Sequence, residues 1–293
     1  MKEIIKLIGN TPVYRIENTN IYVKLEKFNV GGSIQDRTVF AMLEHALQQG
    51  DIKEDTILIE ATSGNTGIAL AVLGAAYRIP VTIVMPDTMS IEKKQLIQAY
   101  GAQLILTDGT KGMKGALEKV EELMQQDPHY VTLRPFDNEV NVNIHYETTG
   151  NEILRQVPNI DIFVTCAETG GSFSGISKRL KEYKETITCV IGEPENSSVI
   201  SGHEPGKHII QGIGAGFTPS ILNHDYIDDI MMVSDDDAIK ETIAFVKETG
   251  VFVGLSSGAN IALAKRLASY YPDKVIVTLA PDGGEKYLSI LNL

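Results

Sequence analysis

The chain has 293 residues, 43% of them hydrophobic and 22% charged, and a net charge of −12 at pH 7. The composition is that of a soluble globular protein, and the acidic balance disfavours non-specific binding to nucleic acids and anionic membranes, because both require positive surface charge. No apolar run approaches the ~20 residues needed to cross a bilayer, and the N-terminus lacks a signal-peptide pattern, so we expect a cytoplasmic location.

The two cysteines, Cys166 and Cys189, each lie in an apolar run typical of a buried strand. We therefore expect two free thiols in the core rather than a disulfide or a catalytic thiol. No cluster of histidine and cysteine has the spacing of metal ligands, so the sequence predicts no metal site.

Apolar, β-branched runs alternate with helical patterns along most of the chain. Strands are predicted at 56–61, 81–86, 102–107, 161–167, 188–194, 229–234 and 274–281. Helices are predicted at 66–78, 90–101, 112–126, 236–250 and 258–271. Because the strand runs are continuously apolar, both faces of each sheet must be covered, which indicates an α/β fold with mostly parallel sheets.

The strands and helices fall into two series, at roughly 38–139 and 158–280. A less regular polar stretch, 134–153, lies between the two series. The glycine-rich segment 195–225 has little periodicity and predicts a long loop packed near the site. Two doubly wound units with a ligand site between them are the expected architecture.

Two turns follow predicted strands and precede helices, in ATSGNTGIALA (61–71) and AETGGSFSG (167–175). The backbone N–H groups at the start of such helices suit a carboxylate or a phosphate. For the first turn alone, an ordinary capped helix start is the better interpretation. The second is a moderate signal for a phosphate-binding loop.

A third turn, GLSSG at 254–258, matches the nucleophile elbow of serine hydrolases around Ser256. Those enzymes place their catalytic histidine after the serine in the chain. All six histidines here precede Ser256, which disfavours a serine hydrolase.

Taken together, the segments resemble the cysteine synthase (O-acetylserine sulfhydrylase) family over essentially the whole chain. The resemblance rests on segments 8–16, 24–37, 61–71, 85–102, 145–153, 211–217, 254–260 and 280–289, in this order. It implies a fold type II architecture that binds pyridoxal phosphate (PLP). It also implies a smaller mobile domain at 38–139, a larger domain combining 1–37 with 140–293, and a homodimer. The family reaction is a β-replacement with sulfide on O-acetylserine, or a related β-substituted alanine, to give cysteine.

The resemblance also implies roles for individual residues. Asn65 would hydrogen-bond the ring hydroxyl of PLP, and Ser256 would meet its pyridine nitrogen. The cofactor phosphate would be held by Thr169, Gly170, Gly171 and Ser172. The loop that closes on the carboxylate of an amino-acid substrate would comprise Thr62, Ser63, Gly64 and Thr66.

Gln35 departs from the family at the reactive position. In the pattern Asn-x-Gly-Gly-Ser-x-x-Asp-Arg, residues 29–37, the family carries lysine where this chain has Gln35. A lysine amine condenses with an aldehyde to form a Schiff base. A glutamine amide cannot, because its nitrogen lone pair is delocalised into the carbonyl. Lys24 and Lys27 lie nearby in sequence, but neither is expected to replace the missing amine.

Glu168 and Pro135 are two further departures. Glu168 stands where the family phosphate loop begins with glycine, and a carboxylate there repels a phosphate unless it points away into solvent. Glycine is also often required where backbone approaches a ligand closely. Pro135 stands where a glutamine helps bind the substrate carboxylate, and proline supplies no side-chain donor.

Two functions therefore stay open. The chain is either a cysteine synthase-type enzyme whose chemistry is severely impaired, with Gln35 natural or introduced, or a non-catalytic relative. Such a relative, PLP-free in the simplest case, would bind a small anion, an amino acid, or a partner such as the tail of serine acetyltransferase. The three departures together favour drift away from PLP chemistry over one isolated substitution.

Overall fold

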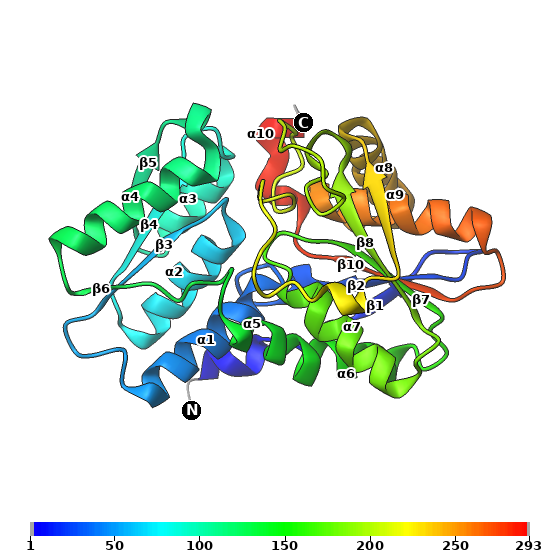
Figure 1. Cartoon of the computed structure of the whole chain (residues 1–293), viewed down its shortest axis with the longest axis horizontal. Helices are drawn as coiled ribbons and strands as arrows, with labels where there is room; N and C mark the ends of the chain where they lie inside the picture. The colour runs from blue at the N-terminus through cyan, green and yellow to red at the C-terminus, as the bar shows by residue number, and fades with distance from the viewer. Residues whose placement is uncertain (1–2, 292–293) are drawn as a thin grey trace.

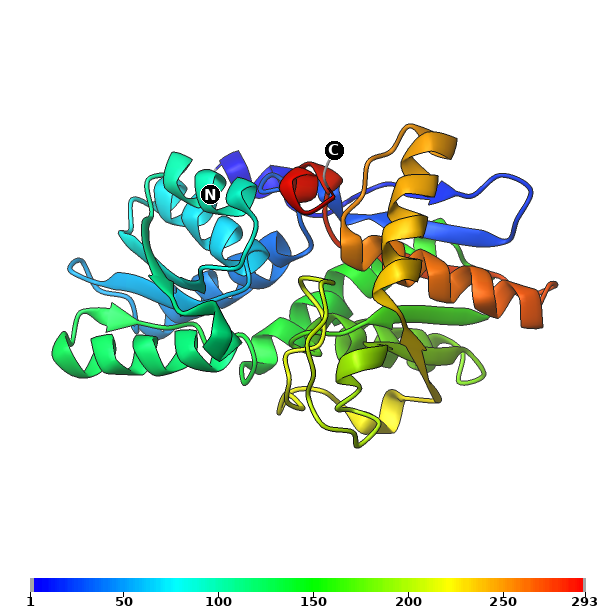
Figure 2. The same cartoon turned by 90° about the horizontal axis from the view of Figure 1, so that it is seen from above.

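The computed structural model describes residues 3–291, which form two lobes, each built around its own β-sheet (Figures 1 and 2). The smaller sheet has the order β5–β4–β3–β6, and all of its strands are parallel. Its strands are β3 (Ile57–Ala61), β4 (Val81–Pro86), β5 (Gln103–Thr107) and β6 (Tyr130–Val131).

Helices cover both faces of the smaller sheet. They are α1 (Gln35–Gln49), α2 (Asn65–Tyr77), α3 (Ile91–Ala99) and α4 (Gly112–Gln126). On one face, Leu43 of α1 and Leu70 of α2 pack with Ile83 of β4. On the other face, Val120 of α4 packs against Ile59 of β3. This double cover is why the strands read as continuous apolar runs.

The larger sheet has six strands in the order β1–β2–β10–β7–β8–β9, parallel except for the β1–β2 pair. The strands are β1 (Val13–Arg15), β2 (Ile21–Leu25), β7 (Ile162–Cys166), β8 (Thr188–Pro194), β9 (Asp229–Val233) and β10 (Ile276–Ala280). Helix α7 (Gly171–Tyr183) packs on one face, and α8 (Asp235–Thr249) and α9 (Leu255–Tyr270) pack on the other.

Short elements complete the chain. They are the 3₁₀ turns η1 (Glu3–Leu7), η2 (Glu26–Phe28), η3 (Gly109–Lys111), η5 (Glu195–Ser197), η6 (His224–Tyr226) and η7 (Gly284–Tyr287), and the last helix, α10 (Leu288–Leu291). The C-terminal elements lie between the lobes against α3 (Figures 1 and 2), where Ser289 donates two hydrogen bonds of 2.7 Å to Glu92.

The predicted α/β fold with mostly parallel sheets is confirmed, and the bounds predicted for β4, α4 and β8 match the structure. The predicted loop at 195–225 is also confirmed, since only short 3₁₀ turns occur in it. No helix within residues 3–291 combines the length and the apolar character that a membrane crossing requires.

The stretch 134–153 was expected to be less regular, and from residue 139 onward this expectation is wrong. It contains α5 (Glu139–Ile144), a π-helical segment η4 (His145–Gly150) and the start of α6 (Asn151–Gln156). Its buried inner face is partly polar, because Asn141 and His145 both hydrogen-bond Thr38 of α1. When polar residues on the buried face of a helix are satisfied by hydrogen bonds, the sequence has no continuous apolar stripe with helical periodicity.

Candidate functional site

The segments that follow β3 and β7 meet between the two lobes. The Ser63 hydroxyl, after β3, donates a 2.8 Å hydrogen bond to Oε1 of Glu168, after β7. Both segments leave the carboxyl ends of parallel strands, where α/β proteins place their ligands. This junction is therefore the candidate functional site.

A cavity of about 40 Å³ lies at the junction. Of the residues predicted from sequence, it brings together Gln35, Ser63, Asn65, Glu168, Thr169, Ser172 and Ser256. Thr62, Gly64, Thr66, Gly170 and Gly171 lie on the same loops but do not line the cavity. The cavity is therefore built from both lobes and from segments far apart in the sequence.

Gln35 begins α1 and reaches the cavity with its side chain. Its backbone N–H donates to Ser33 Oγ at 3.3 Å, whereas its side-chain Oε1 is buried without a hydrogen-bond partner in the described chain. No lysine is among the described residues that line the cavity. An amide with an unsatisfied oxygen thus occupies the wall of the cavity.

Neither nearby lysine replaces an amine at this wall, as expected. Lys24 lies in β2 of the larger sheet, and its buried ammonium donates to the Thr11 carbonyl at 2.6 Å and to Glu152 at 2.7 Å. The Lys27 ammonium donates to the Phe252 carbonyl at 2.7 Å. Both ammonium groups are committed to structural partners.

Two other buried lysines, which sequence reasoning missed, surround Asn65. The Lys286 ammonium donates to the carbonyls of Gly31 and Gly32 and, at 3.0 Å, to Oδ1 of Asn65. The Lys93 ammonium donates to Gln211 at 3.0 Å and lies 4.4 Å from the centre of the Tyr287 ring. Burial lowers the pKa of Lys93 to about 8, although Asp282 and Glu168 oppose this shift. No local sequence pattern predicts that these two lysines are buried.

Asn65 is held at both ends of its amide. Its Nδ2 donates to Oδ2 of Asp282 at 2.8 Å, and Lys286 donates to its Oδ1. The Tyr287 hydroxyl donates to the same Asp282 oxygen at 2.6 Å. The Asn65 amide, which the resemblance assigns to a ring hydroxyl, is therefore engaged within the protein.

The loop before α7 keeps the geometry of an anion cradle. Gly170 has a φ of +83°, and a Cβ there would lie 2.8 Å from the Leu222 side chain, so only glycine fits without strain. Gly171 begins α7; Gly170 supplies no side-chain cap, and the Gly171 N–H donates a long hydrogen bond of 3.4 Å to Thr169 Oγ1. The N–H groups at a helix start favour an anion.

Glu168 works against that cradle. Its φ is not positive, so its backbone conformation does not require glycine. Its carboxyl group is turned into the cleft rather than into solvent, because it accepts from Ser63 and lines the cavity. Burial raises its pKa, and the Ser63 hydrogen bond and the charge of Lys93 oppose the rise.

Pro135 is buried and is linked to the loop before α7 through one residue, Asn141. Its carbonyl accepts a 2.8 Å hydrogen bond from Asn141 Nδ2, and the same nitrogen donates to Thr169 Oγ1 at 3.1 Å. Pro135 therefore supports Thr169 through Asn141 and offers no side-chain donor of its own.

The thiols and Ser256 supply no nucleophile. Cys166 and Cys189 are both free and buried, as predicted. Burial raises the pKa of both thiols, that of Cys189 to about 11. Ser256 lies in the cavity wall at the start of α9, and within residues 3–291 no histidine is hydrogen-bonded to it. The hydrolase alternative therefore has no support from the geometry.

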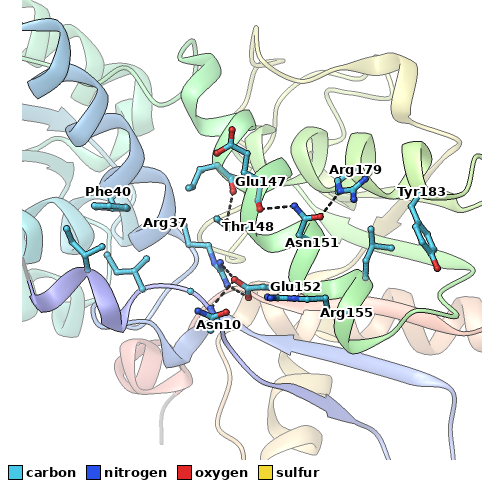
Figure 3. Close-up of a pocket in the computed structure, with 15 residues that line it drawn as sticks. Asn10, Arg37, Phe40, Glu147, Thr148, Asn151, Glu152, Arg155, Arg179 and Tyr183 are labelled. Carbon is cyan, nitrogen blue, oxygen red and sulfur yellow. Dashed lines mark hydrogen bonds and ion pairs between the residues drawn. The ribbon is translucent and has the colours of Figure 1, made fainter. Parts of the chain in front are cut away.

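A larger cavity, of about 710 Å³, lies elsewhere between η1, α1 and the α5–α6 segment (Figure 3). Arg37 and Glu152 on its floor are joined by an ion pair, and Asn10 donates its backbone N–H to Glu152 at 3.0 Å. Asn151 and Arg179 on the wall are also hydrogen-bonded to each other. Arg37 and Glu152 are committed to each other, and none of the sequence-predicted site residues lines this cavity, so we place the chemistry at the smaller one.

Comparisons with known proteins identify the family. The family model described as "Pyridoxal-phosphate dependent enzyme" matches residues 4–282. The chain belongs to this family. It is 43% identical over 291 residues to cysteine synthase B of Campylobacter jejuni, covering 98% of this chain and 97% of that protein.

Solved structures show the same architecture. The cysteine synthase of Entamoeba histolytica matches with a TM-score of 0.93 at 38% identity, covering 99% of this chain and 89% of that one. A lysine-to-alanine mutant of O-ureido-L-serine synthase, bound to O-ureido-L-serine, matches with a TM-score of 0.95 at 35% identity, covering 99% and 92%. The fold type II architecture expected from the sequence is thereby confirmed.

The cavity of this family member does not fit covalently attached PLP. None of the described lining residues carries an amine, and the carboxylate of Glu168, the one acidic side chain among them besides the thiol of Cys166, repels a phosphate. The glycines of the cradle remain, so the conflict is confined to Gln35 and Glu168. As for metals, no group of three or more His, Cys, Asp or Glu side chains in residues 3–291 is arranged to hold an ion.

Proposed function

We propose that this chain is a non-catalytic member of the cysteine synthase family that binds a small amino acid or anion in the cleft without a Schiff base. The observation that carries the proposal is the Gln35 side chain, whose buried oxygen has no partner in a cavity that no described lysine lines. By the resemblance, Gln35 takes the position of the reactive lysine. An amide cannot condense with an aldehyde, so β-replacement of O-acetylserine is severely impaired.

Glu168 and Pro135 support the same proposal. The Glu168 carboxyl group faces the cleft, where a phosphate dianion would meet it. Pro135 supplies no donor for a substrate carboxylate, and its carbonyl is used by Asn141. Three departures around one cleft fit the loss of a function better than a single substitution does.

An absorbance titration tests the proposal. PLP is added to the purified chain, and the visible band of a lysine imine is sought before and after borohydride treatment. We expect no such band. A band that survives dialysis, with borohydride fixing the cofactor to a lysine, would contradict the proposal.

Reversion of Gln35 is the sharper test. Gln35→Lys places an amine in the cavity wall, and Gln48→Lys, on the exposed side of the same helix, is the matched control. If only Gln35 separates the chain from its relatives, Gln35→Lys alone becomes yellow with PLP and converts O-acetylserine and sulfide to cysteine. If Glu168 also blocks the phosphate, activity requires Gln35→Lys combined with Glu168→Gly.

The second candidate is an impaired enzyme that still binds PLP non-covalently. The left-handed Gly170 and the uncapped start of α7 favour it, because that geometry suits a phosphate. PLP binding by the unmodified chain, without an imine band, would select this candidate. By the resemblance, Asn65, Ser256 and the residues 169–172 would then contact the cofactor, and residues 62–66 would contact the substrate.

The remaining family traits are part of the same proposal. We expect 38–139 to move as the smaller domain, and the chain to be a cytoplasmic homodimer. The apolar side chains of Ile5, Ile8 and Phe40 in the larger cavity suit a second copy. Sedimentation velocity tests the dimer. Serine acetyltransferase, through its tail, is the candidate macromolecular partner, and a pull-down with the tail peptide tests it.

A further inference from the structure

The cavity between Gln35 and Glu168 has a negative end. Glu168 is the only residue with an acidic or basic side chain in its described lining, apart from the protonated thiol of Cys166. Burial raises the pKa of Glu168, and a positively charged ligand group beside it would oppose that rise, whereas an anionic group would add to it.

The same end has acceptors that lack donors. Oε1 of Gln35 is buried and unpaired within the described residues, and Glu168 receives one hydrogen bond, from Ser63, on Oε1 alone. The amide of Asn65 and the hydroxyl of Thr169 are already used, since both have protein partners. A primary ammonium group offers three N–H donors and a positive charge, which match these two acceptors.

The start of α2, directly after Ser63, favours a negative group. Helix α2 begins there at Asn65 without a side-chain cap, so its first N–H groups are available. The aliphatic stem of Lys93 packs beneath Gly64, where a Cβ would lie 2.3 Å from its Cδ, and brings a cation close to this helix start. The cleft thus has an acidic side chain on one wall and a positive helix start on the other, joined by the Ser63 hydrogen bond.

We infer that the cleft binds a free α-amino acid as a zwitterion and that Gln35 and Glu168 recognise its ammonium group. The inference deepens the proposed function and rests on it. The ligand carboxylate lies at the start of α2, and its ammonium group donates to the Gln35 oxygen and the Glu168 carboxylate. Glu168 thereby selects an amino acid over a simple carboxylic acid.

Ligand binding replaces the hydrogen bond that joins Ser63 to Glu168 across the cleft. In the structure Ser63 donates to Glu168 across the cleft. The cavity of about 40 Å³ accepts an ammonium head and little more, because each bound water already needs roughly 10–15 Å³. Binding of a whole amino acid releases Ser63 to the ligand carboxylate and Glu168 to the ligand ammonium.

Calorimetric titration of the full chain tests the inference with two matched probes. L-serine carries the ammonium group, and L-glycerate has a hydroxyl in its place on an otherwise similar carboxylate. We expect L-serine to bind at least about tenfold more tightly, since a charge-assisted hydrogen bond is replaced by a neutral contact. Equal affinities for L-serine and L-glycerate would overturn the inference, because the site would then recognise only the carboxylate. Undetectable binding of both probes would overturn it too.

Two variants locate the ammonium contact. Glu168→Gln keeps the shape of the side chain and removes its charge, and we expect L-serine to bind about tenfold more weakly. Gln35→Leu removes the second acceptor and weakens L-serine while leaving L-glycerate unchanged. Glu185→Gln, at an exposed position between α7 and β8, is the control and keeps the affinity of the unmodified chain. A thermal melt checks that each variant is folded.

Unchanged L-serine affinity in Glu168→Gln would overturn the inference. The proposed function fails separately, by the imine band with PLP. Equal binding of L-serine and L-glycerate without such a band would leave the binding function standing and remove only the ammonium contact.

Discussion

Four buried charges at the floor of the larger cavity offer the most quantitative test of the structure. Lys24 of β2, Glu26 of η2, Arg37 of α1 and Glu152 of α6 form a network of ion pairs with distances of 2.7–2.8 Å. The side chain of Lys24 is fully buried and that of Glu152 is 5% exposed. Two positive and two negative charges balance, so the network is neutral as a whole.

The perturbation is Lys24→Met, which keeps the length of the side chain and removes its charge. The Thr11 carbonyl retains the 2.9 Å hydrogen bond from Gln156, and Glu152 retains two hydrogen bonds from Arg37. The network is nonetheless left with one uncompensated buried negative charge. Breaking a buried pair in this way costs about 3–5 kcal/mol, and we expect the lower end because Arg37 remains. For a chain of this size, the midpoint of thermal unfolding falls by roughly 6–15 °C.

The double variant Lys24→Met/Glu152→Gln restores neutrality, which makes the test selective. We expect its loss of unfolding free energy in urea to be smaller than the sum of the two single losses by about 1–3 kcal/mol. Lys274→Met is the control, because Lys274 is 53% exposed and pairs with Asp161 at 3.6 Å, and it should change stability by less than about 0.5 kcal/mol. Additive losses within about 0.5 kcal/mol would refute the reasoning that charge balance stabilises this network.

Three further predictions use other buried groups. Burial raises the pKa of Glu60 from 4.5 to about 7. The contribution of protonated Glu60 to the free energy of unfolding is therefore complete below pH 4.5 and is lost as the pH rises through 7. The urea midpoint of the unmodified chain should fall between about pH 5 and 8, and Glu60→Gln should make this fall smaller. Parallel pH profiles of the two proteins would contradict the prediction. Gly170→Ala should lower the free energy of unfolding by about 1–3 kcal/mol, because Gly170 has a left-handed backbone and Leu222 lies where a Cβ would be. An unchanged melting temperature would contradict this prediction. Cys166 and Cys189 should react with a thiol reagent only in denaturant, and rapid labelling of the native chain would disprove their burial.

The sequence by itself determined the class of fold and several elements. Continuous apolar runs such as 81–86 and 188–194 predicted strands covered on both faces, and the structure has β4 and β8 at these positions. These signals are local, since apolar content and glycine stops act within a few residues of the chain. Gln35, Glu168 and Pro135 were also identified from the sequence, because each departs from a recognisable motif.

The tertiary structure alone decided which side chains share the cleft and which way they point. Glu168 faces Ser63 rather than solvent, and Lys93 and Lys286 are buried around Asn65 without any local pattern to announce it. The helical stretch at 139–156 was likewise hidden, because hydrogen bonds to Thr38 support its buried face. The physical reason is the same in each case. A polar side chain is buried only where distant segments supply its partners, and those partners come together only when the chain has folded.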